Sequence, residues 1–158
     1  MTVQVGDKLP AGSLNIMGAE GPQQLTISEL FDGKKVVMFA VPGAFTPGCS
    51  MTHLPGFVVN ADKIKANGVD SIICLSVNDA FVMSAWGKAQ NAEELIMAAD
   101  GSGDYTKALG LSLDASGFGM GERSQRYAMI VDNGEITYLG VDAKGIEASA
   151  ADAIIATL

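Results

Sequence analysis

Segments with the apolar pattern of buried strands alternate along the chain with segments whose apolar residues have helical spacing. The run from Val36 to Val41 is apolar throughout, and DSIICLSV at residues 70–77 carries apolar residues on both sides of an extended strand. Strands with two apolar sides are typical of parallel sheets that helices cover on both faces. A segment with helical spacing begins at Thr46-Pro47 and ends at Asn67-Gly68, between these two runs. The pattern therefore predicts a strand–helix–strand crossover.

The alternation continues on either side of this unit. TISELFDGKK, residues 26–35, predicts a short helix with Thr26 or Ser28 near its start. YAMIVDNGEITYLGV, residues 127–141, predicts two strands joined by a turn at Asp132-Asn133-Gly134. We expect further helices at residues 79–90, capped by Asn78 or Asp79, at 104–109 and at 145–158, a strand at 95–99, and a Gly-rich loop at 116–126.

These elements together predict an α/β fold. Parallel crossovers come early and an antiparallel hairpin comes late, so the central β-sheet should be mixed, with helices on both faces. The chain has 158 residues, of which 48% are hydrophobic and 18% are charged, a composition that suits one core. We expect residues 1–158 to form a single domain.

The charge balance limits the classes of partner. Ten basic against 18 acidic residues leave a net charge of −8, which opposes binding to nucleic acid or to acidic membrane surfaces. The first residues, MTVQVGDKLPAG, lack the basic start and apolar core of a targeting segment, and no apolar run approaches a membrane span. We therefore expect a cytoplasmic protein with no nucleic-acid and no membrane partner.

Cysteine and histidine are scarce. Two cysteines cannot build a disulfide framework, and together with the one histidine they provide too few soft ligands for a closed zinc site without an acidic fourth ligand. Free thiols in a reducing compartment are the simpler interpretation, and we expect no metal.

The stretch FAVPGAFTPGCSMTHLPGF, residues 39–57, carries the candidate chemistry. It can be interpreted as a helix start, with Thr46 as the N-cap, Pro47 at the first helical position and Cys49 at the third. Unpaired backbone N–H groups and the helix dipole favour a thiolate at such a position. Free cysteines also pack as small buried apolar groups, but the helix-start pattern favours a reacting thiol here.

His53 follows Cys49 by one helical turn, so it can orient the thiolate or act as its base in a Cys/His hydrolase. No third residue completes a hydrolase arrangement, and the absence of an arginine soon after Cys49 argues against a phosphatase. Pro55 interrupts the predicted helix and indicates either a kink just beyond the cysteine or ordinary helix geometry.

Several of these residues match known motifs. PGAFTPGCS at residues 42–50 resembles the active-site signature of the peroxiredoxins, thiol peroxidases with a thioredoxin-like fold. THLPGF at residues 52–57, CLSVND at 74–79 with Trp86 beyond it, and RYAMIVDNG at 126–134 resemble the type II, or peroxiredoxin-five, subfamily. The resemblance covers most of the chain.

The resemblance implies a role for each residue of the site. Cys49 would be the peroxidatic cysteine, which attacks hydrogen peroxide or an alkyl hydroperoxide and becomes a sulfenic acid. Thr46 would hydrogen-bond peroxide and sulfur, Pro42 would shield the site from water, and Arg126 would polarise thiolate and substrate. Sequence chemistry alone leaves Arg123 as a competitor, and only the family pattern favours Arg126. The resemblance also implies a homodimer and no cofactor.

The chain departs from one family pattern in its second cysteine. Animal members carry a resolving cysteine near the C-terminus, whereas this chain has no cysteine after Cys74. Cys74 matches the position that plant-type members are thought to use, but it lies in a predicted buried strand, and a disulfide requires Cα atoms within about 7 Å. Two mechanisms are therefore open: a Cys49–Cys74 disulfide, or one cysteine reduced by an external thiol such as glutaredoxin, glutathione or thioredoxin. A peroxide-sensing redox-switch protein and a Cys/His hydrolase are the alternative functions.

Overall fold

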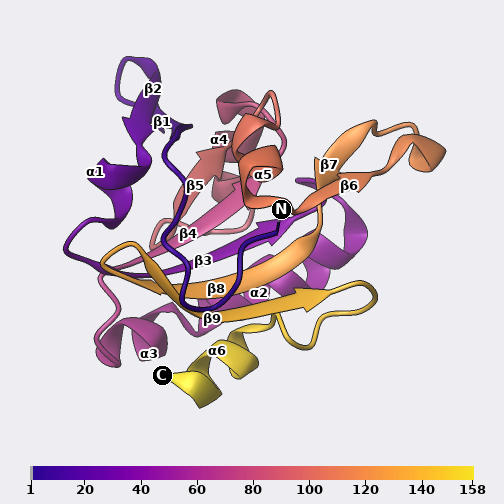
Figure 1. Cartoon of the computed structure of the whole chain (residues 1–158). Coiled ribbons are helices and arrows are strands. Elements are labelled where there is room, and N and C mark those ends of the chain that lie inside the picture. The colour runs from indigo at the N-terminus through magenta and orange to yellow at the C-terminus, as the bar shows by residue number, and fades with distance from the viewer. Residues whose placement is uncertain (1) are drawn as a thin grey trace.

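The computed structural model describes residues 2–158, which form a seven-stranded mixed sheet and a separate two-stranded ribbon (Figure 1). The strands of the large sheet lie in the order β2-β1-β5-β4-β3-β8-β9. Strands β3, β4 and β5 pair in parallel, and the other pairs of this sheet are antiparallel. The predicted mixed sheet is confirmed.

The bounds of the strands are β1 Ser13–Gly18, β2 Gly21–Thr26, β3 Lys35–Val41, β4 Ser71–Ser76, β5 Ile96–Ala99, β6 Ser112–Asp114, β7 Glu122–Ser124, β8 Arg126–Asp132 and β9 Glu135–Asp142. The α-helices are α1 Ile27–Phe31, α2 Leu54–Val59, α3 Ala61–Ala66, α4 Ala80–Ala89, α5 Asp104–Leu109 and α6 Ala151–Thr157. A π-helical turn, η1, spans Cys49–His53, and a 3-10 turn, η2, spans Ser116–Phe118.

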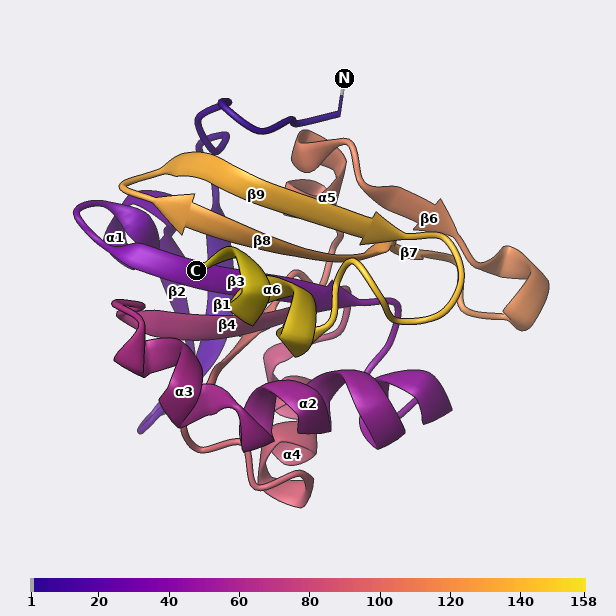
Figure 2. The ribbon, with the colours of Figure 1, turned by 90° about the horizontal axis from the view of Figure 1, so that it is seen from below.

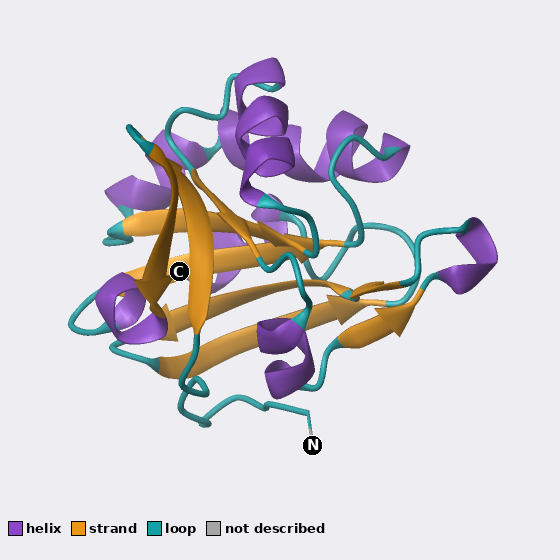
Figure 3. Ribbon diagram, turned by 90° about the horizontal axis from the view of Figure 1, so that it is seen from above, coloured by secondary structure: helices purple, strands orange, loops and turns teal. Residues whose placement is uncertain are grey.

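Helices cover both faces of the sheet, as Figures 2 and 3 show from opposite sides. Helices α2, α3, α4 and α6 pack with alternate residues of the strands, among them Phe39 and Cys74, in one apolar core. Helices α1 and α5 pack on the other face with the intervening strand residues, among them Met38 and Ile73. Strands β3 and β4 are therefore buried on both sides, as their sequence predicts.

Local sequence signals explain where several elements begin and turn. Thr26 caps α1 in a capping box with Glu29, and Asp79 caps α4 by accepting from the Val82 N–H. The hairpin between β8 and β9 turns at Asn133 and Gly134, whose φ angles of 48° and 81° are those of the turn that an Asn-Gly pair favours. These predictions are confirmed.

Four regions differ from the expectation. The opening of the chain forms the β1–β2 hairpin, which its mixed polar composition did not indicate. The Gly-rich segment contributes η2 and β7, and β7 pairs with β6. The segment from Pro47 to Asn67 is divided at Asn60 into α2 and α3. The final helix spans only Ala151–Thr157, because residues 147–149 direct their backbone N–H groups to the Asp142 carboxylate.

Candidate active site

The cysteine-bearing loop leaves the carboxyl end of the central strand β3 and leads into a helix. Pro47 and Gly48 have helical backbone, and the Ser50 N–H donates to the Thr46 carbonyl at 2.9 Å. Cys49 therefore lies in the first helical turn, which confirms the predicted helix start. The Thr46 hydroxyl does not cap this helix. It donates to the Gly43 carbonyl at 2.7 Å and so closes the turn that precedes the helix.

Asn78, just after the end of the parallel strand β4, holds this loop. The Asn78 carboxamide oxygen accepts from the Ala44 N–H at 3.0 Å and from the Ser76 hydroxyl at 2.6 Å. Between Ala44 and the helix, Phe45 has a φ of 65°, a left-handed conformation that is unusual for a bulky residue. The loop is thus held in a strained conformation by hydrogen bonds from its surroundings.

The helix that carries the cysteine is widened at its first turn. The Leu54 N–H donates to the Cys49 carbonyl five residues back, which is the π-helical pattern. Pro55 follows and has no N–H to donate, so it cannot extend an ordinary α-helical ladder through this turn. Of the two geometries that the sequence left open at Pro55, the structure has the irregular one, and the irregular turn ends just before that residue.

The Cys49 sulfur is buried and receives one hydrogen bond from the described residues 2–158. Arg126, at the start of β8, donates from Nη2 to Cys49 Sγ at 3.2 Å. Strand β8 pairs with β3, which brings this arginine beside the loop that follows β3. Arg123 instead donates from Nε to the Met120 carbonyl. The structure therefore selects Arg126 over Arg123 as the partner of the cysteine.

His53 contacts the arginine and not the sulfur. Its Nδ1 lies 2.8 Å from Arg126 Nη1, and its Nε2 lies 2.8 Å from the Ser149 carbonyl oxygen. A guanidinium only donates and a carbonyl only accepts, so the partners assign the neutral tautomer with the proton on Nε2. His53 orients Arg126, and neither of its nitrogens is free to act as a base for Cys49.

Burial keeps the histidine neutral. The ring lies beside the stacked rings of Phe39 and Phe57, with centroid distances of 5.0 and 5.7 Å. Burial lowers the pKa of His53 to about 4, the hydrogen bond to Ser149 opposes this shift, and the charge of Arg126 adds to it. The ring therefore accepts from Arg126 throughout the neutral pH range.

A carboxylate holds the segment that carries Ser149. Asp142 accepts from the backbone N–H groups of Glu147, Ala148 and Ser149, and from the Ser149 hydroxyl, at 2.7 to 3.1 Å. Burial raises the pKa of Asp142, but these hydrogen bonds outweigh it and hold the pKa at about 2. The sequence did not identify Asp142 and Ser149 as residues of the site. The only signal there is an aspartate at a strand end followed by a Gly- and Ser-containing stretch.

The second cysteine lies in the core. Cys74 is fully buried in β4, beside Phe39 of β3, and both cysteines are free thiols. Burial raises the pKa of Cys74 well above its usual range, and the nearby Cys49 adds to this shift. Cys74 is therefore an unreactive thiol in this conformation.

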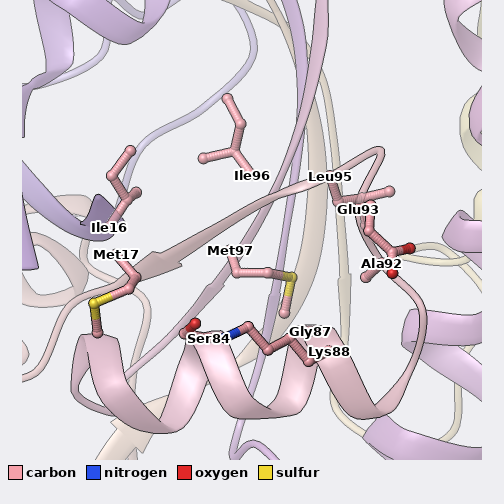
Figure 4. A pocket seen from close by; sticks show the side chains of 10 residues that line it. All are labelled: Ile16, Met17, Ser84, Gly87, Lys88, Ala92, Glu93, Leu95, Ile96 and Met97. Atoms are coloured by element: carbon pink, nitrogen blue, oxygen red, sulfur yellow. The ribbon is translucent and has the colours of Figure 1, made fainter. Parts of the chain in front are cut away.

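One cavity lies beside the loop that carries Cys49, and another lies apart from it. One of about 430 Å³ is lined by Pro42, Gly48 and Arg126, and by residues 142–146 that follow β9. The other, of about 320 Å³, lies between α4, β1 and β5, where Met17 and Met97 face the helix (Figure 4). None of the residues around Cys49 lines this second cavity. Among residues 2–158, no cluster of side chains has the composition of a metal site.

Comparisons with known proteins agree with this geometry. The family model described as Redoxin matches residues 4–155. Peroxiredoxin-2C of Oryza sativa subsp. japonica is 50% identical over 145 residues, and Peroxiredoxin-2D of Arabidopsis thaliana is 46% identical over 145 residues; each match covers 90% of both chains. The crystal structure of reduced Prx3 in complex with H2O2 from Vibrio vulnificus is 57% identical, covers 99% of both chains and superposes with a TM-score of 0.96.

The neutral His53 predicts a pH dependence of stability. Its pKa falls from 6.5 in a free side chain to about 4 in the folded chain, so the unfolded chain binds more protons between these values. The free energy of unfolding should therefore fall as the pH drops from 6.5 to 4, by about 3 kcal/mol in total. Urea denaturation of wild type and His53→Gln across this range measures the difference. Carboxylates titrate equally in both proteins, so equal pH slopes would contradict the assignment.

Proposed function

The chain belongs to the redoxin family, within it to the type II peroxiredoxins, and we propose that it reduces hydrogen peroxide and alkyl hydroperoxides with electrons from an external thiol. It is a thiol-dependent peroxidase whose peroxidatic cysteine is Cys49. The observation that carries the mechanism is the hydrogen bond from Arg126 Nη2 to Cys49 Sγ at 3.2 Å.

The reaction follows from this contact. The Cys49 thiolate attacks the terminal hydroxyl oxygen of the peroxide, so that an S–O bond forms and the O–O bond breaks. The sulfur becomes a sulfenic acid, and the other oxygen leaves as an alkoxide or hydroxide that takes up a proton. Arg126 stabilises the negative sulfur before the attack, and its fixed donors stabilise the charge that develops on the leaving oxygen. One thiol then forms a mixed disulfide and releases water, and a second thiol regenerates Cys49.

We assign supporting roles to Thr46 and Pro42 from their contacts. The Thr46 hydroxyl donates its one hydrogen bond to the Gly43 carbonyl. Its oxygen lone pairs are therefore left to accept a hydrogen bond from the peroxide O–H. Thr46 thus orients the substrate rather than donating to the sulfur. Pro42 has no N–H and lines the cavity beside Arg126, so it forms part of the cavity wall without offering a donor to water.

The site gives no support to a Cys/His hydrolase. Such an enzyme needs a histidine that accepts the proton of the cysteine, whereas both nitrogens of His53 are engaged by Arg126 and Ser149. A peroxide sensor shares the first step of the reaction. Sustained peroxide consumption with an external thiol distinguishes the enzyme from the sensor.

We propose that the sulfenic acid is reduced directly by the external thiol and that Cys74 does not resolve it. Cys74 lies within β4 and is covered on both sides of the sheet. A disulfide would require η1 to unwind and Cys74 to become accessible. Glutathione with glutaredoxin, or thioredoxin, can supply the thiol.

The thiol chemistry supports a proposal for the compartment. Two free cysteines suit a reducing environment, and we propose the cytoplasm. No helix within residues 2–158 is long and apolar enough to span a membrane. Chloroplastic Peroxiredoxin-2E of Arabidopsis thaliana is similar to this chain, so localisation of the labelled protein in cells is the deciding observation.

The resolving mechanism is tested by the intact mass of the reduced protein after one equivalent of hydrogen peroxide. We expect wild type and Cys74→Ser each to gain one oxygen atom, because Cys49 is oxidised and Cys74 stays buried. Cys49→Ser should gain none. Loss of two hydrogens in wild type, abolished by either substitution, would establish a Cys49–Cys74 disulfide instead. A wild type that does not react would contradict the peroxidase function.

We also propose a homodimer that covers exposed aromatic side chains near the site. Phe45 and Phe81 are 55% and 64% exposed, and each follows closely in sequence one partner of the hydrogen bond between Ala44 and Asn78. Introducing a charge with Phe45→Glu or Phe81→Glu should shift the protein from dimer to monomer in sedimentation velocity. Val59→Glu, at a still more exposed apolar residue of α2, is the control. Monomeric wild type, or dimers in both variants, would contradict the proposal.

A further inference from the structure

The segment between β9 and α6 has a defined conformation although it contains no regular element. The Asp142 carboxylate accepts all four of its hydrogen bonds from residues 147–149. The Tyr138 hydroxyl donates to the Ala148 carbonyl at 2.7 Å, and a Cβ atom on Gly140 would collide with the same carbonyl. The direction of the neighbouring Ser149 carbonyl is therefore fixed by strand β9.

The Ser149 carbonyl determines which nitrogen of His53 carries the proton. Because a carbonyl only accepts, it holds the proton on Nε2 and leaves the Nδ1 lone pair for Arg126. The other tautomer would place an N–H against the guanidinium, where two donors would repel. Arg126 uses Nη1 for this contact and Nη2 for Cys49 Sγ, so the position of its planar group depends on the histidine.

Asp142 does not form a direct ion pair with Arg126. Arg126 and Asp142 lie opposite each other in the β8–β9 ladder, and both line the same cavity. The ion pairs among residues 2–158 are nevertheless Lys65–Glu94 and Lys107–Glu122, and neither includes these two residues. The four hydrogen bonds from residues 147–149 direct the carboxylate away from the guanidinium.

We propose that Asp142 is a positioning residue of the peroxidase reaction. It fixes the Ser149 carbonyl, the carbonyl fixes the tautomer of His53, and the histidine fixes the guanidinium against the cysteine sulfur. This inference rests on the proposed function of the site, but the link between Asp142 and His53 is measurable without peroxide.

The test is Asp142→Asn, measured by two readouts. In asparagine one carboxylate oxygen becomes an NH2 group, which opposes a backbone N–H and displaces the Ser149 carbonyl. We expect the rate constant for oxidation of Cys49 by hydrogen peroxide to fall by about 10-fold or more, because small misplacements of reacting groups have large effects. His53 is the only histidine, so its ring nitrogens give one set of NMR signals. These should show the Nε2–H tautomer in wild type and a mixture in the variant.

Controls separate positioning from general destabilisation. Asp100→Asn removes a carboxylate that also accepts two backbone N–H bonds, from Tyr105 and Thr106, but contacts none of the site residues. It should leave the rate and the tautomer as in wild type. In an Arg126→Lys background, Asp142→Asn should lower the rate no further, because its effect passes through the guanidinium. If Asp142→Asn does not fold, Ser149→Ala removes only the hydroxyl bond to Asp142 and is judged by the same two readouts.

Each outcome decides the proposal. A wild-type rate in Asp142→Asn would overturn it. A lower rate with an unchanged tautomer, or a loss that adds fully to that of Arg126→Lys, would also overturn it, because Asp142 would then act on the fold or directly on the charge of Arg126. If wild type itself did not react with peroxide, the function would fail, and the tautomer comparison would still decide whether Asp142 controls His53.

Discussion

The site depends on one hydrogen bond between a partly buried guanidinium and a buried sulfur. A thiolate without water around it is costly unless a donor or a positive charge compensates it, and Arg126 supplies both. The arginine comes from β8 and the cysteine from the loop after β3, so the antiparallel pairing of these two strands brings them together. The sheet topology and the helix start are thus parts of the same arrangement.

A neutral histidine is the appropriate partner for this arginine. A carboxylate in its place would form an ion pair with the guanidinium and reduce its attraction for the sulfur and for the leaving oxygen. His53 instead accepts one hydrogen bond without a charge of its own, because burial against Phe39 and Phe57 keeps its pKa at about 4. The one carboxylate opposite Arg126 in the ladder, Asp142, is engaged by residues 147–149. The positive charge of Arg126 therefore remains directed at the cysteine.

The sequence predicts the parts of the site that depend on local structure. Thr46-Pro47 marks the helix start, and the apolar runs mark β3 and β4, so the position of Cys49 follows from neighbouring residues. The choice of Arg126 over Arg123 came only from the family resemblance, because strand pairing between distant segments selects it. The contact of His53 with Arg126 was likewise not predicted. The helix expected at 145–158 was too long because propensity does not reveal that Asp142 binds the backbone of residues 147–149.

The most direct test of this account is the second-order rate constant for the reaction of the reduced protein with hydrogen peroxide in Arg126→Lys. Lysine keeps the positive charge but lacks the planar pair of donors that joins His53 to Cys49. The account predicts that the rate constant falls by roughly 100-fold or more, while Arg123→Lys stays close to wild type. A rate constant for Arg126→Lys comparable to that of wild type would show that charge alone suffices and would contradict the central role of the oriented guanidinium.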